Sequence, residues 1–423
     1  MATRSVVGFA IVLVLLAGRA AAGDVLVVAP IAGPGIDFIA VQEAVAAAHD
    51  GDVLVILPGD YDGQVLLENR QLVLAGVTGP GGERPRLAGL LLSNLAADRA
   101  TIVRGLDIQP TFFGPNSLTV QQCAGPVLLE DCRVLDFGVQ YDSPQVVDCD
   151  HVVFTRCTLQ GPRGLPFSAS AATPGGSGLQ VTDSSVTLYD VSATGGRGSD
   201  AELLFSFHPP ASVGGAGVTV SGGTLFVAGC NLSGGAGGDG TDPLGPGDCF
   251  PPANGGDGLV LDGLLRRLDT TLAAGAPGVE PPACPPAAAP GSDLVVLGGS
   301  IVDIPQTLRR FALNSPVAPG DIVSLDVTGA PLEPVVLLQA LAPLGQWLGG
   351  LKGTLAGAPP YTTFTLGFLD SAGTLHLEFP LPAGVLPPGL SSLLIVDQLV
   401  TPAAGGGGLL SSPSALVLVD EIP

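Results

Sequence analysis

The chain has 423 residues, of which 46% are hydrophobic and 5% aromatic, and its formal net charge at pH 7 is −22. This hydrophobicity excludes a disordered chain, and the acidity excludes nucleic acid as a partner, because a polyanion would be repelled. The 62 glycines and 39 prolines lack the chain-long period of three that collagen requires, which leaves a turn-rich all-β protein.

The N-terminus has the pattern of a secretion signal. Arg4 supplies a positive charge, residues 6–18 are apolar, and the small residues at 20–23 offer a cleavage site after Ala22. The alternative is an uncleaved anchor, but the apolar run is short for a spanning helix and no later run is longer. The sequence therefore predicts a signal peptide over 1–22, no membrane span, and a secreted, extracellular or cell-surface protein.

A short amphipathic helix is predicted near the start of the mature chain. Hydrophobic residues at helical spacing share one face: Phe38, Val41, Ala44, Val45 and Ala48. The apolar strand VLVILPG follows from Val53. An open end of a β-helix, the fold that the next repeats predict, exposes strand edges and an apolar core. We therefore expect this helix to cap the first coil.

Internal repeats of short strands, about 25 residues long at their shortest, follow the predicted helix. Superposition without gaps gives one anchor position in six of them: Leu106, Cys132, Cys157, Val191, Cys230 and Leu268. The anchor and the position two residues later are mostly apolar, and the residue between them is polar. One Gly/Pro-rich turn grows while the rest of the unit stays constant, as in a solenoid. The pattern predicts a parallel β-helix over 23–305.

The start of this region resembles a known family. Residues 36–76, with the Pro58-Gly59-Asp60-Tyr61 turn after the first strand, resemble the start of secreted right-handed parallel β-helix proteins of the pectin-lyase-like superfamily. The resemblance covers roughly 24–305 and implies a right-handed coil. Enzymes of this fold are usually polysaccharide lyases or glycoside hydrolases, so the resemblance implies such activities without assigning one.

From about Gln306 the sequence changes to alternating strands separated by Pro/Gly turns. This pattern predicts a small antiparallel β-sandwich over 306–423. The segment resembles C-terminal modules of secreted bacterial β-helix proteins, for which no chemistry is implied.

Seven cysteines in a secreted chain permit disulfides, but the odd number leaves at least one unpaired. Stacked neighbours in successive coils have parallel Cβ vectors, which is poor disulfide geometry. We therefore predict five buried thiols: Cys123, Cys132, Cys149, Cys157 and Cys230. Cys249 and Cys284 lie in Pro-rich loops of successive coils, where we predict a disulfide.

Charged residues gather near two neighbouring corners of the repeat: Asp131, Arg133, Asp148, Asp150, His151 and Arg156. In one interpretation they form a catalytic metal or sugar site, with Asp148 and Asp150 as the candidate metal ligands and Arg133 or Arg156 as the base of a lyase. In the other, which we favour, the arginines pair with aspartates one coil away in ion pairs of little energy. The β-helix region lacks lysine, another common lyase base.

Sugar-binding faces usually present aromatic rings, and the loops of the repeat offer four candidates: Phe112, Phe113, Phe205 and Phe207. The alternative is that these rings fold back over the β-helix. The segment Gly234–Gly240 matches one copy of a calcium-binding nonapeptide repeat, but one copy cannot form a stack. We interpret it as a flexible loop.

Three functions remain open from the sequence. The first, which we favour, is a non-catalytic extracellular platform that binds a polysaccharide or a cell-surface glycan, as a monomer and without a cofactor. The second is a polysaccharide lyase or glycoside hydrolase acting on acidic glycans, with calcium as the cofactor of a lyase. The third is a structural component of an envelope or matrix.

Overall fold

The computed structural model describes residues 23–110, 117–135, 143–168, 171–201, 209–242, 249–281, 288–348, 350–386, 390–403 and 406–422. Within these residues no helix has the length and apolarity needed to cross a membrane. The predicted signal peptide lies outside the described residues and stays a prediction.

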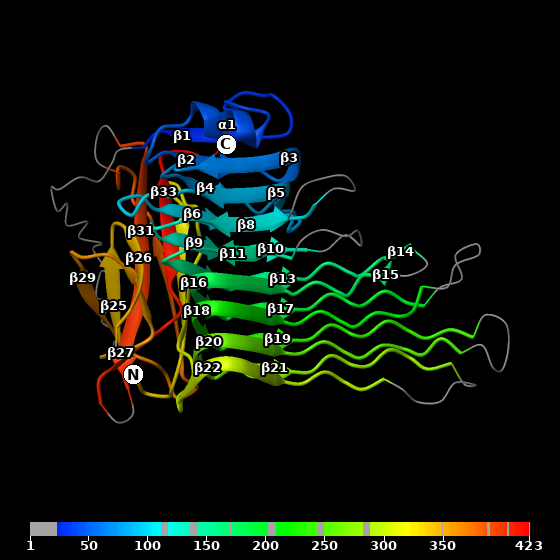
Figure 1. Cartoon of the computed structure of the whole chain (residues 1–423). Helices are drawn as coiled ribbons and strands as arrows, with labels where there is room; N and C mark the ends of the chain where they lie inside the picture. Colours follow the sequence, from blue (N-terminus) through cyan, green and yellow to red (C-terminus); the bar gives the residue numbers. More distant parts are fainter. Residues whose placement is uncertain are drawn as a thin grey trace.

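A parallel sheet of 20 strands forms the body of the protein, consistent with the predicted β-helix (Figure 1). Its first coils contain β1 (Val25–Val28), α1 (Val41–Ala47), β2 (Val53–Ile56), β3 (Gly59–Glu68), β4 (Val73–Gly76), β5 (Pro85–Ser93), β6 (Thr101–Arg104), β7 (Asp107–Ile108) and β8 (Leu118–Gln121). The middle coils contain β9 (Val127–Glu130), β10 (Arg133–Val134), β11 (Gln145–Val147), β12 (Val152–Thr155), β13 (Thr158–Gln160), β16 (Leu179–Tyr189) and β17 (Ser192–Thr194). The last coils contain β18 (Val218–Ala228), β19 (Asn231–Ser233), β20 (Leu259–Leu268), β21 (Thr271–Ala273) and β22 (Leu294–Ile304). We call these strands the coiled sheet.

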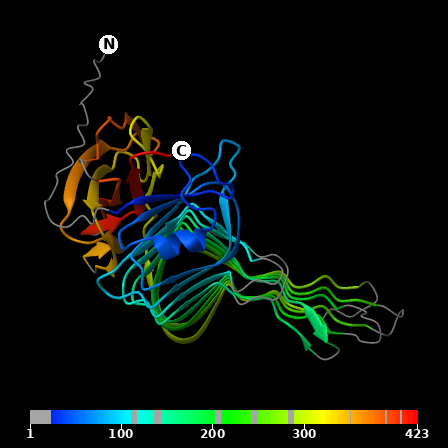
Figure 2. The ribbon, with the colours of Figure 1, turned by 90° about the horizontal axis from the view of Figure 1, so that it is seen from above.

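The helix α1 lies at one end of the coiled sheet (Figures 1 and 2). Val41, Ala44 and Val45 are buried and join the main hydrophobic core, which confirms the predicted apolar face. Near the start of β3, the Tyr61 hydroxyl donates a hydrogen bond of 2.8 Å to the Leu57 carbonyl. The first coil is therefore tied down by both packing and a buried polar contact.

The anchor positions of the repeat are buried as predicted in five coils, each at most 3% exposed: Leu106, Cys132, Cys157, Val191 and Cys230. The sixth assignment, Leu268, is wrong by two residues. Leu268 pairs with Ala228 rather than with Cys230, and it faces the C-terminal module. The residue that takes the place of Cys230 is Thr270, because Asn231 pairs with Thr271. Because Thr270 is polar at an inward position, the apolar/polar pattern of the sequence placed the anchor on the wrong residue.

Along one side of the coiled sheet, both the inward-facing and the outward-facing residues of the strands are buried. Every residue of β2, β4, β6, β9 and β12 is buried. Their inward residues fill the main core, and outward residues such as Val55, Ile102 and Val153 form a second cluster with Val396 and Val417 of the C-terminal module. The module therefore covers this side of the coiled sheet along its length, as Figure 1 shows.

The C-terminal module consists mainly of antiparallel sheets. A three-stranded sheet contains β23 (Arg310–Leu313), β24 (Ile322–Thr328) and β30 (Thr374–Pro380). A larger sheet contains β25 (Pro334–Ala340), β27 (Leu351–Lys352), β29 (Thr362–Phe368), β31 (Ser392–Pro402), β32 (Gly408–Leu410) and β33 (Ser414–Val419), and a separate pair contains β26 (Pro343–Trp347) and β28 (Thr354–Gly357). Residues of the two larger sheets share one core, including Phe311, Val323, Val335 and Leu399.

A long, flat projection leaves the coiled sheet on the side away from the module (Figures 1 and 2). It consists of the described residues of the segments between β13 and β16, β17 and β18, β19 and β20, and β21 and β22, and it includes the hairpin of β14 (Pro166–Ser168) and β15 (Ala171–Ala172). The segments that lead away from the coiled sheet stack on one another in one layer, and the segments that lead back to it stack in a second layer. We call this part the glycine-rich projection.

Backbone hydrogen bonds hold the glycine-rich projection together in two directions. Within a layer, the Gly195 N–H donates to the Ser233 carbonyl of the next coil, at 2.9 Å. Between layers, the Gly215 N–H donates to Gly196, and the Gly235 N–H donates to Gly215, both at 2.8 Å. The layers lie so close that a Cβ on Gly195 would be 2.0 Å from the Gly215 carbonyl oxygen. Glycine is needed here for close approach of backbones.

The prediction that Gly234–Gly240 is a flexible loop is therefore wrong. Besides the Gly235 contact, the Gly237 and Gly240 N–H groups donate to the next coil at 2.9 and 3.0 Å. The backbone N–H of Asp239 donates to the Asp200 carboxylate at 2.8 Å. This segment is one extended strand-like layer element, and its Asp239 carboxylate pairs with Arg197 at 2.6 Å.

Candidate functional site

Two corners of the coiled sheet are built from residues in the left-handed backbone conformation. At the first corner these residues stack coil on coil: Gly105, Asp131, Arg156, Asp190, Gly229 and Asp269, all with φ between 45° and 70°. At the second corner they include Asn94, Gln122 and Asp148. Glycine, asparagine and aspartate tolerate this conformation best. Much of the polar character of the corners therefore has a conformational cause.

The first corner also contains a pocket of about 540 Å³. Its charged lining residues are four arginines and one aspartate: Arg84, Arg104, Arg133, Arg156 and Asp131. The opposite wall comes from residues 313–316 of the C-terminal module. We call this cavity the arginine pocket. It lies at the seam between the coiled sheet and the module, and three of the six predicted catalytic candidates line it.

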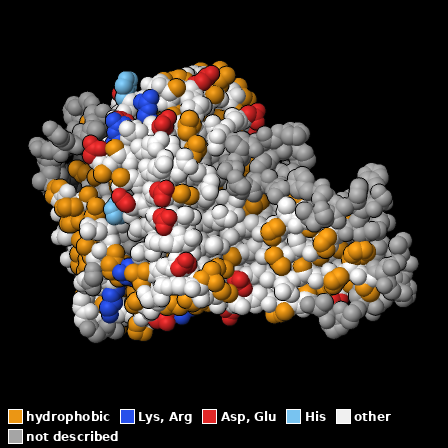
Figure 3. Space-filling view, viewed as in Figure 1, with side chains coloured by type: hydrophobic (Ala, Val, Ile, Leu, Met, Phe, Trp, Pro, Cys, Tyr) orange, Lys and Arg blue, Asp and Glu red, His pale blue; other side chains and the backbone are white. Residues whose placement is uncertain are grey.

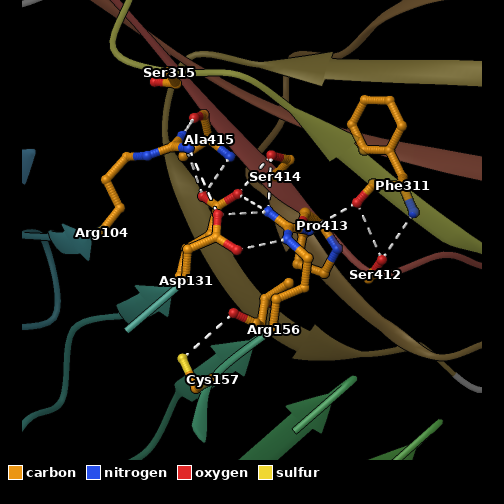
Figure 4. A network of polar contacts seen from close by, with 12 residues as sticks. Arg104, Asp131, Arg156, Cys157, Phe311, Ser315, Ser412, Pro413, Ser414 and Ala415 are labelled. Carbon is orange, nitrogen blue, oxygen red and sulfur yellow. Dashed lines mark hydrogen bonds and ion pairs between the residues drawn. The ribbon is translucent and has the colours of Figure 1, made fainter. Parts of the chain in front are cut away.

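A buried carboxylate organises the floor of the arginine pocket. Glu130 is 0% exposed and forms ion pairs with Arg156 and with Arg104, the latter at 3.5 Å. It also accepts hydrogen bonds from the Ser414 hydroxyl at 2.5 Å and from the Ala415 N–H at 2.8 Å. A buried charge is stable only when it is paired in this way. The network joins β9 to β33 of the module (Figure 4).

Arg156 lies at the centre of the same network. Its guanidinium donates to the Phe311 carbonyl at 2.8 Å and to the Asp131 carboxylate at 2.9 Å. Burial opposes its charge, but the Glu130 and Asp131 carboxylates outweigh that effect and raise the pKa of Arg156. A guanidinium held in its charged form cannot take a proton from a substrate near neutral pH.

Arg133 is the most exposed of the four arginines of the pocket. Its side chain is 44% exposed and forms a bidentate pair with Asp107, with one N–O distance of 2.7 Å. This hydrogen bond raises the pKa of Arg133. The predicted ion pairs of Arg133 with Asp107 and of Arg156 with Asp131 are therefore present, but Arg156 is far more buried than a surface pair would be.

The other three predicted catalytic candidates do not join the pocket. Asp148 and Asp150 are exposed, and Asp148 is a residue of the second corner. Asp150 and His151 line a different cavity of about 530 Å³, next to β26, where a Cβ on Gly345 would be 3.1 Å from the His151 Cβ. The described residues contain no group of three His, Cys, Asp or Glu side chains that could hold a metal ion.

The cysteine and aromatic predictions have different outcomes. The five predicted thiols are free and buried, which confirms them: Cys123, Cys132, Cys149, Cys157 and Cys230. A hydrogen bond with the stacked Cys149 lowers the pKa of Cys123 to about 7. Cys284 and all four phenylalanine candidates, Phe112, Phe113, Phe205 and Phe207, lie outside the described residues. The predicted Cys249–Cys284 disulfide and the aromatic sugar platform stay predictions.

Sequence reasoning missed two arginines of the pocket. Arg104 could have been identified from the sequence, because alignment of the repeats places it directly beside Glu130 of the next coil. The structure confirms that pairing. Arg84 follows a glycine-rich turn outside the repeat and has no comparable signal. Its guanidinium reaches the Asp131 carbonyl and lies 3.5 Å from Asp107.

Comparison of the chain with protein-family models and with curated proteins finds no match.

Proposed function

We propose that this protein is a secreted, non-catalytic binding protein for acidic glycans, and that the arginine pocket receives a carboxylate of the ligand. In this proposal residues 23–305 form a right-handed parallel β-helix of pectin-lyase-like type, capped by α1, and residues 306–423 form a β-sandwich. The coiled sheet supplies a rigid support, and the module closes one wall of the site.

The observation that carries the proposal is the charge of the pocket. The chain has 16 Lys and Arg against 38 Asp and Glu, yet four arginines and one aspartate line this cavity. Placing four guanidinium groups together is costly unless anions compensate them. The carboxylates that pair with these arginines are three, Asp107, Glu130 and Asp131, so one positive charge is left in excess. Arginine matches the planar geometry of a carboxylate and binds it through two hydrogen bonds. Uronate units of acidic glycans present such carboxylates.

The contacts of the same residues favour binding over catalysis. A lyase needs a base, but the pKa values of Arg133 and Arg156 are raised by their carboxylate partners. A hydrolase needs two available carboxylates. Glu130 and Asp131 are both occupied by ion pairs with arginines. Nothing in this mode of binding requires a cofactor.

Calorimetric titration of the mature chain with oligogalacturonate tests the proposal. We expect binding that weakens with added salt and that disappears when the uronate carboxylates are methyl-esterified, because the attraction is electrostatic. Arg133→Ala should weaken binding about tenfold or more. The matched control is Arg267→Ala, which removes an arginine of similar exposure that pairs with Asp303 at 2.8 Å, away from the pocket.

Two results would contradict the proposal. Equal affinity for esterified and free oligogalacturonate would remove the role of the carboxylate, and equal loss in the two arginine variants would remove the role of the pocket. The ultraviolet absorbance of unsaturated products, followed with and without calcium, separates binding from lyase activity. We expect no change in absorbance, and a calcium-dependent rise would replace the binding proposal with the lyase.

A further inference from the structure

The four arginines of the arginine pocket differ in how their charges are balanced. Arg104 and Arg156 form the inner pair, which shares two carboxylates, Glu130 and Asp131. Both guanidinium groups of the inner pair also donate to backbone carbonyls of the C-terminal module, as the network in Figure 4 shows. The inner pair is therefore neutralised, and it holds the module against the coiled sheet.

Arg84 and Arg133 form the outer pair, which shares a single carboxylate. The Asp107 carboxylate accepts a hydrogen bond from the Arg133 Nε at 2.7 Å, and one of its oxygens also lies 3.5 Å from the Arg84 guanidinium. Within the described residues, no other acidic side chain forms an ion pair with either arginine. Two guanidinium groups thus face one carboxylate, so the positive charge that the pocket has in excess belongs to the outer pair.

Asp107 pairs with the outer pair although a third arginine is its direct neighbour. Strand register aligns Asp107 with Arg86 on one side and with Arg133 on the other. The Arg86 guanidinium pairs with the Asp60 carboxylate at 2.6 Å instead. The Asp107 side chain is 12% exposed, and both of its oxygens accept from the guanidinium fork of Arg133. A carboxylate of a ligand would bind Arg133 through the same two hydrogen bonds.

We propose that Asp107 is an internal competitor of the ligand, an inference that rests on the proposed function. In the free protein Asp107 occupies the guanidinium fork of Arg133, and the uronate carboxylate binds by taking this fork from it. Arg133 is accessible to a ligand because 44% of its side chain is exposed. Asp107 keeps Arg84 as its partner after the exchange. The bound state therefore has one carboxylate for each arginine of the outer pair, and no buried charge is left without a partner.

The competition affects both affinity and selectivity. Every ligand must first replace an existing ion pair, so part of its electrostatic attraction is offset, and binding is weaker than an empty fork would give. A group that attracts a guanidinium less than a carboxylate does, such as a methyl ester or a hydroxyl, does not displace Asp107. The acidic residue thus restricts the pocket to charged sugar units.

Calorimetric titration of Asp107→Asn with oligogalacturonate tests the inference. Asparagine keeps the shape of the side chain but removes the competing charge, so we expect binding to tighten about tenfold, with a gain that shrinks as salt is added. The matched control is Asp60→Asn, which removes a carboxylate of the same column that pairs with Arg86 outside the pocket. The control should change the affinity less than about twofold.

Arg84→Ala supplies a second test, which decides the question if Asp107→Asn does not fold. Without Arg84, displacement by the ligand leaves Asp107 buried and unpaired, so binding should weaken about tenfold or more. Arg86→Ala is the matched control, because Arg86 lies two residues away and pairs with Asp60 rather than with a residue of the pocket. Denaturant unfolding identifies any variant that does not fold.

Unchanged or weaker binding by folded Asp107→Asn would overturn the inference, as would equal effects of a pocket variant and its control. The glycan proposal fails separately. If the wild-type protein binds and Asp107→Asn binds no more tightly, the pocket still receives a carboxylate and only the competitor is rejected. If Asp107→Asn binds and the wild-type protein does not, the competitor is supported and the binding function of the wild-type protein is rejected. Absence of binding in both proteins rejects both proposals.

Discussion

The coiled sheet and the glycine-rich projection contain stacked coils of the same chain but are stabilised differently. In the coiled sheet, apolar side chains such as Phe154 and Leu188 fill a continuous core between the strands. In the projection, the layers touch through their backbones, and a Cβ on Gly195 or Gly214 would be 2.0 or 2.1 Å from a carbonyl oxygen of the other layer. Side-chain burial holds the first region, and hydrogen bonds with close backbone contact hold the second.

Backbone hydrogen bonds hold the described parts of the long Gly/Pro-rich insertions in place. An ordinary loop of this length leaves its backbone to water, whereas here each added glycine segment gains hydrogen bonds to the next coil and to the opposite layer. In the view of Figure 3 the visible face of the projection carries hydrophobic and uncharged side chains with few charges, while charged side chains gather on the body.

Deletion of a core side chain should give the largest effect. Phe154 is 0% exposed at the centre of the coiled sheet, so Phe154→Ala should cost about 3–5 kcal/mol of unfolding free energy. Phe368→Ala, at an exposed ring, should cost almost nothing. Denaturant unfolding of both variants measures the difference. Similar costs would show that burial in the coiled sheet is not the main source of stability.

A buried carboxyl group of the module should make stability depend on pH. Asp397 is 1% exposed, and burial raises its pKa to about 7. Between pH 4 and 7 the unfolded chain ionises this group while the folded chain keeps it neutral, so the protein should lose stability as pH rises, by on the order of 1 kcal/mol per unit. Asp397→Asn should remove this slope in thermal melts, and an unchanged slope would assign it to other groups.

Substitution of a projection glycine should have a smaller and local effect. Gly215→Ala places a Cβ against the Gly176 carbonyl oxygen and forces these two neighbouring segments apart, at a cost of about 1–3 kcal/mol. Faster hydrogen exchange in the neighbouring glycine segments, with little change in the melting of the coiled sheet, is the expected result. Gly33→Ala is the control, because the nearest atom to its added Cβ is 3.9 Å away. Cooperative loss of the whole fold would show that the two regions are not separable.

The smallest effect should come from the charged surface of the projection. A hydrogen bond from the Val279 N–H and the nearby Arg197 lower the pKa of Asp239 despite some desolvation. Its contribution is therefore present at neutral pH and lost as pH falls through the lowered pKa. Asp239→Asn should cost under about 1 kcal/mol at pH 7. Hydrogen exchange of the Val279 amide, compared at neutral and acid pH, measures the contribution of Asp239. Protection of this amide that persists at acid pH would contradict the prediction.

Short-range patterns determined much of the fold by themselves. The alternation around the anchor positions, and the 3/4 spacing before Val53, depend on neighbours in sequence, so they predicted the parallel coils and α1 correctly. The same reasoning failed at Leu268, where the polar Thr270 occupies an inward position. It also failed at Gly234–Gly240, because the role of those glycines depends on segments about 20 and 40 residues away.

Only the tertiary structure decided where the candidate site lies and what each charge does. The repeat brought Asp131, Arg133 and Arg156 to one corner, but Glu130 acquires its role from Ser414 and Ala415, almost 300 residues later. Arg84 enters the pocket from a turn that no repeat predicts. Local sequence specifies which face of a strand is apolar. The packing of the module against the coiled sheet determines which charges are buried, and with them the shape and sign of the pocket.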